Sequence, residues 1–171
     1  MKNRHILIVI IILIGAFSRI IPHPPNFTAI GAISILGGVY FGKNYLAFLV
    51  PILSMLISDF LLGFNMTLSV YLSFLIMIPL GIGIKNKLSN LSVIKTSIYA
   101  SIVFFLITNF SVWIFSTVYP NNIYGLLICY YAGIPFFFNT LLGNIFFSFS
   151  LFGIYEIVSK RKFIYINSWK I

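Results

Sequence analysis

The stretch that decides the fold is SIYASIVFFLITNFSVWIFSTV, residues 97–118, which contains no charged side chain. It is longer than the roughly 20 residues that an α-helix needs to cross a hydrocarbon core of about 30 Å. Apolar runs at residues 6–21 and 46–64 approach the same length. None of these runs alternates apolar and polar residues as the strands of a membrane β-barrel do. The sequence therefore predicts an all-α, polytopic membrane protein.

The composition supports this prediction. Hydrophobic residues make up 60% of the 171 residues and charged residues only 8%, whereas soluble domains contain about 25% charged residues. No stretch has the polar composition of a soluble module or of a long linker. We therefore expect a single transmembrane domain over residues 1–171.

Six helices are expected, separated by turns that contain proline, glycine or lysine. The expected ranges are residues 5–21, 26–42, 46–62, 67–84, 93–118 and 135–158. Pro22, Pro24 and Pro25 lack amide hydrogens and must end the first helix. That helix could instead be a cleaved signal peptide, but the membrane helices that follow favour an uncleaved span. The second helix is rich in small residues, which predicts that it packs inside the bundle.

Residues 121–133 form a separate case. They are too apolar for a free loop and too few to cross the membrane and return. We therefore expect a short interfacial or re-entrant helix there, a structure that membranes tolerate only where protein or water surrounds the backbone.

The orientation follows from the positive charges, because Lys and Arg accumulate on the cytoplasmic side. With six spans and the N-terminus inside, Arg19 is the one basic residue on the outer side. The cytoplasmic set is Lys2, Arg4, Lys43, Lys85, Lys87, Lys95, Lys160, Arg161, Lys162 and Lys170. Both termini are therefore expected in the cytoplasm. The net charge of +9 is scattered at helix ends, so it does not indicate nucleic-acid binding.

Four polar side chains fall in the outer half of four different helices. Their depth can be counted along each helix from a marker, a residue expected at the cytoplasmic end of that helix. The depth is about 21 Å for Arg19, Asp59 and Asn109 and about 24 Å for Asn144. The marker for Asn109 is Lys95. Ionisable groups at such depth require a reason, since each costs roughly 2.5 to 3.5 kcal/mol near the membrane centre. These four residues could form the floor of an outward-facing pocket. Alternatively, Arg19 could simply pair with Asp59 while the asparagines form hydrogen bonds between helices.

Further polar and aromatic side chains are expected above this layer, toward the outside. A mixture of rings and amides suits a small-molecule site. The aromatic members could equally form the belt at the membrane interface, and the histidine could be an ordinary loop residue. The candidate substrate-binding residues are Arg19, His23, Asn26, Asp59, Asn109, Trp113, Tyr119, Asn139 and Asn144.

Nothing in the sequence indicates an enzyme. The two acidic residues, Asp59 and Glu156, are expected at opposite membrane faces and cannot act as a carboxylate pair. No hydrolase, metalloprotease or nucleotide-binding motif is present. His23 has no second histidine nearby, and Cys129 is expected to be an inert packed thiol. We therefore expect neither a cofactor nor a metal, and transport energy would have to come from a partner or from a gradient.

Four segments carry a resemblance to a known family. They are SRIIPHPPNFTAIGAISILGGVYF (18–41), LVPILSMLISDFLLGF (49–64), TNFSVWIFSTVYP (108–120) and GIPFFFNTLLGN (133–144). The chain resembles a bacterial family of small membrane proteins of unknown function, generally described as candidate transport proteins. The resemblance implies a location in the bacterial cytoplasmic membrane.

That family is in turn similar in architecture to the S components of energy-coupling-factor vitamin transporters. The similarity implies a six-helix protein that captures a vitamin-like solute from outside, together with a possible energising membrane partner. S components often carry an AxxxA pattern in the first helix for docking that partner, and this chain has only Gly15, Ala16 and Ser18 there.

Two hypotheses therefore stand at the level of sequence. The first is a membrane transport protein that captures a small solute in an outward pocket. The second is a scaffold or accessory subunit without transport activity, which binds another membrane protein through its glycine-rich second helix.

Overall fold

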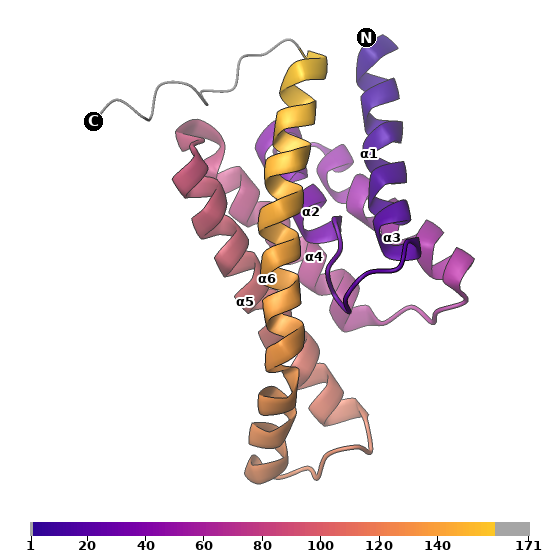
Figure 1. The fold of residues 1–171 in the computed structure, drawn as a ribbon, viewed down its shortest axis with the longest axis vertical. Coiled ribbons are helices and arrows are strands. Elements are labelled where there is room, and N and C mark those ends of the chain that lie inside the picture. The colour runs from indigo at the N-terminus through magenta and orange to yellow at the C-terminus, as the bar shows by residue number, and fades with distance from the viewer. Residues whose placement is uncertain (1, 160–171) are drawn as a thin grey trace.

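The computed structural model describes the backbone of residues 2–159 and the side chains of residues 7–155 and 157. Within that range the chain is helical throughout apart from short connections, so the all-α prediction is confirmed (Figure 1). In chain order the elements are α1 (Lys2–Ile20), α2 (Ile30–Phe41), α3 (Tyr45–Leu62), α4 (Leu68–Ile84), the 3-10 helix η1 (Lys85–Lys87), α5 (Asn90–Phe115) and α6 (Ile123–Ser159).

Successive α-helices run in opposite directions, so the connections gather at two ends of the bundle. We call one the basic end, because Lys43, Lys85 and Lys87 lie in its connections. The other, the cavity end, holds the connections 21–29, 63–67 and 116–122. Figure 1 shows that α5 and α6 continue well past the first two of these connections. The predicted positions of Lys2, Arg4 and the basic residues after 159 lie outside the described side chains.

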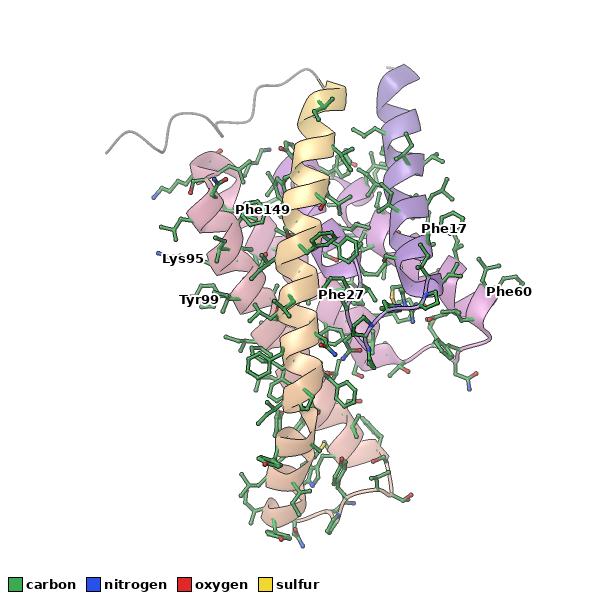
Figure 2. All side chains as sticks on the ribbon, in the orientation of Figure 1. Phe17, Phe27, Phe60, Lys95, Tyr99 and Phe149 are labelled. Carbon is green, nitrogen blue, oxygen red and sulfur yellow. The ribbon has the colours of Figure 1, made fainter. Side chains whose placement is uncertain are left out.

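Four helical stretches are long and apolar enough to cross a membrane: Tyr45–Leu62, Leu68–Lys87, Asn90–Phe115 and Ile123–Tyr155. The outer faces of the bundle carry exposed apolar side chains, which Figure 2 shows for Phe17 on α1 and Phe60 on α3. Soluble monomers rarely expose large continuous apolar patches. Helix length and apolar exposure therefore both indicate a membrane protein with lipid around its perimeter.

The short helix α2 lies at the centre. Eleven of its twelve residues are buried, and it packs against the five other α-helices. At twelve residues it spans only about 18 Å, less than a bilayer, but it does not need to meet lipid. The prediction that the small-residue helix packs inside the bundle is confirmed. Its start is later than the predicted residue 26, because Asn26 adopts a left-handed backbone with φ of 67° and interrupts helix formation.

Glycines permit the closest crossing, between α2 and α4. A Cβ added to Gly38 would collide with the backbone oxygen of Ile78, and a Cβ added to Gly81 would collide with that of Ile35. The two helices therefore touch backbone to backbone. Neither residue can gain a methyl group unless the helices separate.

The prediction of a separate interfacial or re-entrant helix at residues 121–133 is wrong. Residues from Ile123 onward are the first turns of α6, which runs without a break through Pro135 to Ser159. Pro135, the expected start of the last helix, lies inside α6. A proline inside a membrane helix removes one hydrogen bond, and neighbouring helices and local adjustments can make that loss tolerable.

The other boundaries differ from the predictions by a few residues. The largest of these shifts is three residues, at the start of α1 and at both ends of α5, which starts at Asn90 and ends at Phe115. Ser89 Oγ caps its N-terminus by accepting a hydrogen bond from the Ser92 amide, and Ser92 Oγ accepts one from the Ser89 amide. This reciprocal capping box fixes the start of the helix.

The α2–α4 crossing generates a stability prediction. Gly81→Ala should lower the free energy of unfolding by about 1–3 kcal/mol, because the added methyl overpacks a backbone contact. Gly83→Ala is the matched control, since a Cβ at Gly83 meets nothing within 4 Å. The control should be neutral or slightly stabilising, as alanine favours helix over glycine. Thermal unfolding of both variants in detergent would test this, and equal stability of the two would contradict the crossing.

Candidate functional site

An ion pair joins the last turns of α1 and α3 at the cavity end. Arg19 Nη1 lies 2.5 Å from Asp59 Oδ1. The same nitrogen donates to Ser58 Oγ at 2.6 Å and approaches the Met55 carbonyl oxygen at 3.4 Å. The side chains are only 17% and 8% exposed. The proposed pairing of Arg19 with Asp59 is therefore present, and it is largely shielded from solvent.

A third helix completes the contact. Tyr71, in the first turn of α4, donates its hydroxyl to Asp59 Oδ2 at 2.6 Å. Asp59 lies three residues before the end of α3, and Tyr71 lies three residues after the start of α4. The hairpin between the two helices thus places the residues at the same level. Both oxygens of Asp59 are engaged, one by Arg19 and one by Tyr71.

The helix ends explain the charge placement. Gly63 takes a left-handed backbone with φ of 69° and ends α3 one turn after Asp59. The carboxylate therefore lies near the negative end of the helix dipole, which disfavours it. Arg19 lies in the last turn of α1, where a positive charge is favoured. The pair thus compensates the unfavourable position of Asp59.

The connection 21–29 forms a strap across the cavity end. Ser18 Oγ accepts a hydrogen bond from the Ala29 amide at 3.0 Å and donates to the Gly15 carbonyl at 2.7 Å, so it joins the end of α1 to the start of α2. Phe27 lies beside α6 (Figure 2). It anchors the strap there, because its ring packs against two phenylalanines of that helix. Gly143 of α6 lets the strap backbone lie close, since a Cβ there would stand 3.2 Å from it. The strap is therefore fixed to two helices.

Beneath the strap lies a cavity of about 370 Å³, which we call the arginine cavity. Polar side chains face it from the strap, from α1 and from α6, while aromatic and aliphatic side chains of α3, α4 and α5 form the opposite walls. Its lining residues are Arg19, His23, Pro25, Asn26, Thr28, Gly31, Met55, Leu62, Phe64, Val70, Phe74, Phe104, Thr140 and Asn144. The volume is in the range of small-molecule sites.

Two neighbouring cavities share walls with it. The aspartate cavity, about 320 Å³, contains Asp59 and shares Arg19 and Val70 with the arginine cavity. The hairpin cavity, about 360 Å³, lies between the strap and the projecting α5–α6 pair and shares Asn26 and Val70. Val70 therefore lines all three cavities, which together form a recess across the cavity end.

Asn144 forms the link between α6 and its neighbours. It is 2% exposed, and its Nδ2 donates to Ser101 Oγ of α5 at 2.9 Å. Its Oδ1 lies against Gly31 of α2, where a Cβ would collide with it. The interhelical hydrogen bond expected of the asparagines is present here, and Asn144 also borders the arginine cavity.

Asn109 does not lie at the same level as Arg19, Asp59 and Asn144. The predicted layer of four polar residues is therefore wrong for Asn109. It lies eight residues past Ser101, about 12 Å further along α5. Lys95, on which its predicted depth rests, is not at the helix start, because α5 begins at Asn90. Asn109 Nδ2 donates to the Phe105 carbonyl of its own helix at 2.8 Å, and the residue lines the hairpin cavity with Tyr119 and Cys129.

The structure does not bring two of the predicted residues to these cavities. Trp113 Nε1 donates to the Pro120 carbonyl at 3.0 Å and closes the α5–α6 turn. Asn139 is half-buried and lines none of the three cavities. His23 and Asn26, in contrast, both line the arginine cavity from the strap. Cys129 is 2% exposed and donates to the Asn109 carbonyl at 3.3 Å, the behaviour of a packed thiol.

Sequence reasoning missed Tyr71, Thr28 and Thr140. The symmetric spacing of Asp59 and Tyr71 about the α3–α4 turn could have revealed the first. Thr28 and Thr140 reach the arginine cavity only because the strap packs on α6, and no local pattern signals that contact. Within the described residues, no group of three or more His, Cys, Asp or Glu is placed to hold a metal ion.

The cavity end is built from the segments 18–41, 49–64 and 133–144, and the family comparison covers all of them. Residues 1–167 match a protein family described as a family of unknown function, DUF6580. The chain belongs to the DUF6580 family. No curated protein and no solved structure matches it. DUF6580 membership establishes kinship over nearly the whole chain and carries no activity with it.

The ion pair generates a second stability prediction. Asp59→Leu should reduce the free energy of unfolding by about 3–5 kcal/mol, because it leaves Arg19 buried without its partner. The double variant Arg19→Met with Asp59→Leu should be more stable than that single variant, since no unpaired charge remains. Unfolding by a denaturing detergent would measure both. Phe60→Leu, at a neighbouring position that is 87% exposed, is the control. A double variant less stable than Asp59→Leu would contradict this account.

Proposed function

We propose that this protein is a bacterial membrane transport protein that captures a small, vitamin-like solute from the extracytoplasmic side, in the manner of an S component. The observation that carries the proposal is the arginine cavity. It combines a partly buried arginine and several hydroxyl and amide side chains with walls of Phe74, Phe104 and Met55. Recognition sites for small molecules have this composition, with apolar walls for contact area and a few polar groups for orientation.

The proposed orientation places the cavity end outside. Lys43, Lys85 and Lys87 lie at the opposite end, and positive charges mark the cytoplasmic side of short connections. With that orientation both termini are cytoplasmic in the bacterial cytoplasmic membrane. The recess is then reached from the periplasm or cell exterior, past the strap and the α5–α6 pair.

The residues take different parts in the proposed capture. Arg19, Asn26, Thr28, Thr140 and Asn144 would orient the solute, since all five line the arginine cavity. Asp59 and Tyr71 would hold Arg19 in place, because their polar atoms are already engaged with each other or with the arginine. Inward release would require an energising membrane partner or a conformational change driven by the solute gradient.

The alternative remains an accessory or scaffold subunit without transport activity. Its predicted docking surface was the glycine-rich helix α2, which the chain itself buries. Gly31, Gly37 and Gly38 are occupied by contacts with α6, α3 and α4. A scaffold would have to use another surface. The candidate is the projecting end of the α5–α6 pair, where Phe115 is 83% exposed.

A solute screen tests the capture proposal. The full chain in detergent should gain thermal stability with at least one member of a library of vitamins, their precursors and related small solutes, because a ligand that binds only the folded state stabilises it. Val70→Trp should abolish the gain by filling the recess. Leu68→Trp is the matched control on the same helix, since Leu68 is 67% exposed. No gain with any solute would favour the accessory subunit.

The orientation has its own test. Met66→Cys lies in the α3–α4 connection at the cavity end and Lys87→Cys lies at the basic end, and both positions are exposed. A membrane-impermeant maleimide should label Met66→Cys in intact cells and should label Lys87→Cys only after permeabilisation. The native Cys129 is 2% exposed and should give little background. The reverse labelling pattern would contradict the proposed orientation.

A further inference from the structure

Arg19 commits only one of its nitrogens to the protein. Its contacts to Met55, Ser58 and Asp59 all involve Nη1. Within the described part of the chain, Nε and Nη2 make no hydrogen bond. A guanidinium has five N–H donors in a fixed planar arrangement. The edge formed by Nε and Nη2 therefore presents three donors that no residue of the described chain accepts.

Arg19 lines the arginine cavity, and neither Nε nor Nη2 is among the fully buried side-chain atoms that lack a hydrogen-bond partner. A bound molecule can therefore reach these donors. Arg19 is the one Lys, Arg, Asp or Glu side chain among the residues that line this cavity. Asp59 is not among these lining residues, and each of its oxygens already accepts one hydrogen bond, from Arg19 and from Tyr71. The cavity thus offers a surplus of donors, which suits a ligand with acceptor oxygens and disfavours a cation.

The shape of the free edge narrows the ligand class further. Parallel N–H bonds from Nε and Nη2 match the two oxygens of a carboxylate, which is the usual bidentate partner of arginine. The rest of the cavity suits an apolar body. Phe74 and Phe104 pack with ring centroids 5.2 Å apart, and Met55, Leu62 and Val70 complete that wall. A compact apolar monocarboxylate satisfies both halves of the cavity.

We infer that the captured solute is an apolar or aromatic monocarboxylate whose two oxygens bind the Nε–Nη2 edge of Arg19, while Asp59 and Tyr71 act as positioning residues that never touch it. This inference rests on the proposed capture function and adds the ligand class to it. The pairing with Asp59 fixes the plane of the guanidinium before the ligand arrives. A prepositioned donor pair loses little conformational freedom on binding.

The test uses the full chain in nanodiscs of neutral phosphatidylcholine, with probes that differ in one group. 3-Phenylpropanoate should bind at least tenfold more tightly than 3-phenylpropanamide, which has the same skeleton and no charge. Arg19→Lys keeps a positive charge beside Asp59 but has no bidentate edge, so it should weaken 3-phenylpropanoate binding at least tenfold. Thermal stability and equilibrium titration measure both effects. If Arg19→Lys does not fold, the comparison of the two probes on the native chain still decides whether the cavity prefers a carboxylate. Val70→Trp, in which the recess is filled, then serves as the control without binding.

The outcomes separate the two proposals. Equal binding of the acid and the amide overturns the carboxylate assignment and leaves solute capture intact. Stabilisation by neutral solutes alone does the same, whereas silence from every charged and neutral solute overturns both. Inorganic phosphate binding as tightly as 3-phenylpropanoate overturns the carboxylate geometry. Binding of dodecanoate supports the carboxylate assignment. Tighter binding of dodecanoate than of 3-phenylpropanoate indicates a carboxylate from the bilayer, and weaker binding indicates one from the aqueous phase.

Discussion

The arrangement of the cavity end depends on the ion pair between Arg19 and Asp59. It joins the last turns of two helices through residues that are forty positions apart in the chain, and Tyr71 adds a third helix through the same carboxylate. Replacing a buried ion pair with apolar residues is often neutral for stability, so its main effect need not be energetic. What it supplies is register, because a shift of α1 or α3 by one residue would leave two charges unpaired in a low-dielectric environment. The strap begins two residues after Arg19, so the ion pair also fixes the position at which the strap starts.

The second constraint is the enclosure of α2. A helix too short to cross a bilayer can sit within a membrane domain only when protein covers it, since lipid offers its exposed backbone ends no hydrogen bonds. Glycines at the crossings with α3, α4 and α6 allow that close cover. The same enclosure leaves room above the N-terminus of α2, where Gly31 and Asn144 meet at the arginine cavity. The fold and the cavity thus arise from one packing arrangement.

The sequence predicted what depends on local pattern. Helix number, the break at Pro22, the buried second helix and the pairing of Arg19 with Asp59 all follow from apolar run length, proline chemistry and the rarity of charges in a membrane. It failed where tertiary packing overrides local signals. Pro135 looks like a helix start and lies within α6, and the depth of Asn109 was misjudged because Lys95 lies inside α5 and not at its start. Thr28 and Thr140 reach the cavity through the fold of the strap, which no single segment encodes.

The length of α6 has a consequence for the surrounding lipid. Its apolar stretch Ile123–Tyr155 covers 33 residues, about 50 Å at the helical rise, against a hydrocarbon core of about 30 Å. Tilt alone cannot absorb that difference, because membrane helices rarely lean beyond about 40°. The excess must be met by local thickening of the bilayer or by a projecting apolar end, and both change in energy with acyl-chain length. The energy of this protein in a membrane therefore depends on the thickness of the bilayer, and so on the lipid composition around it.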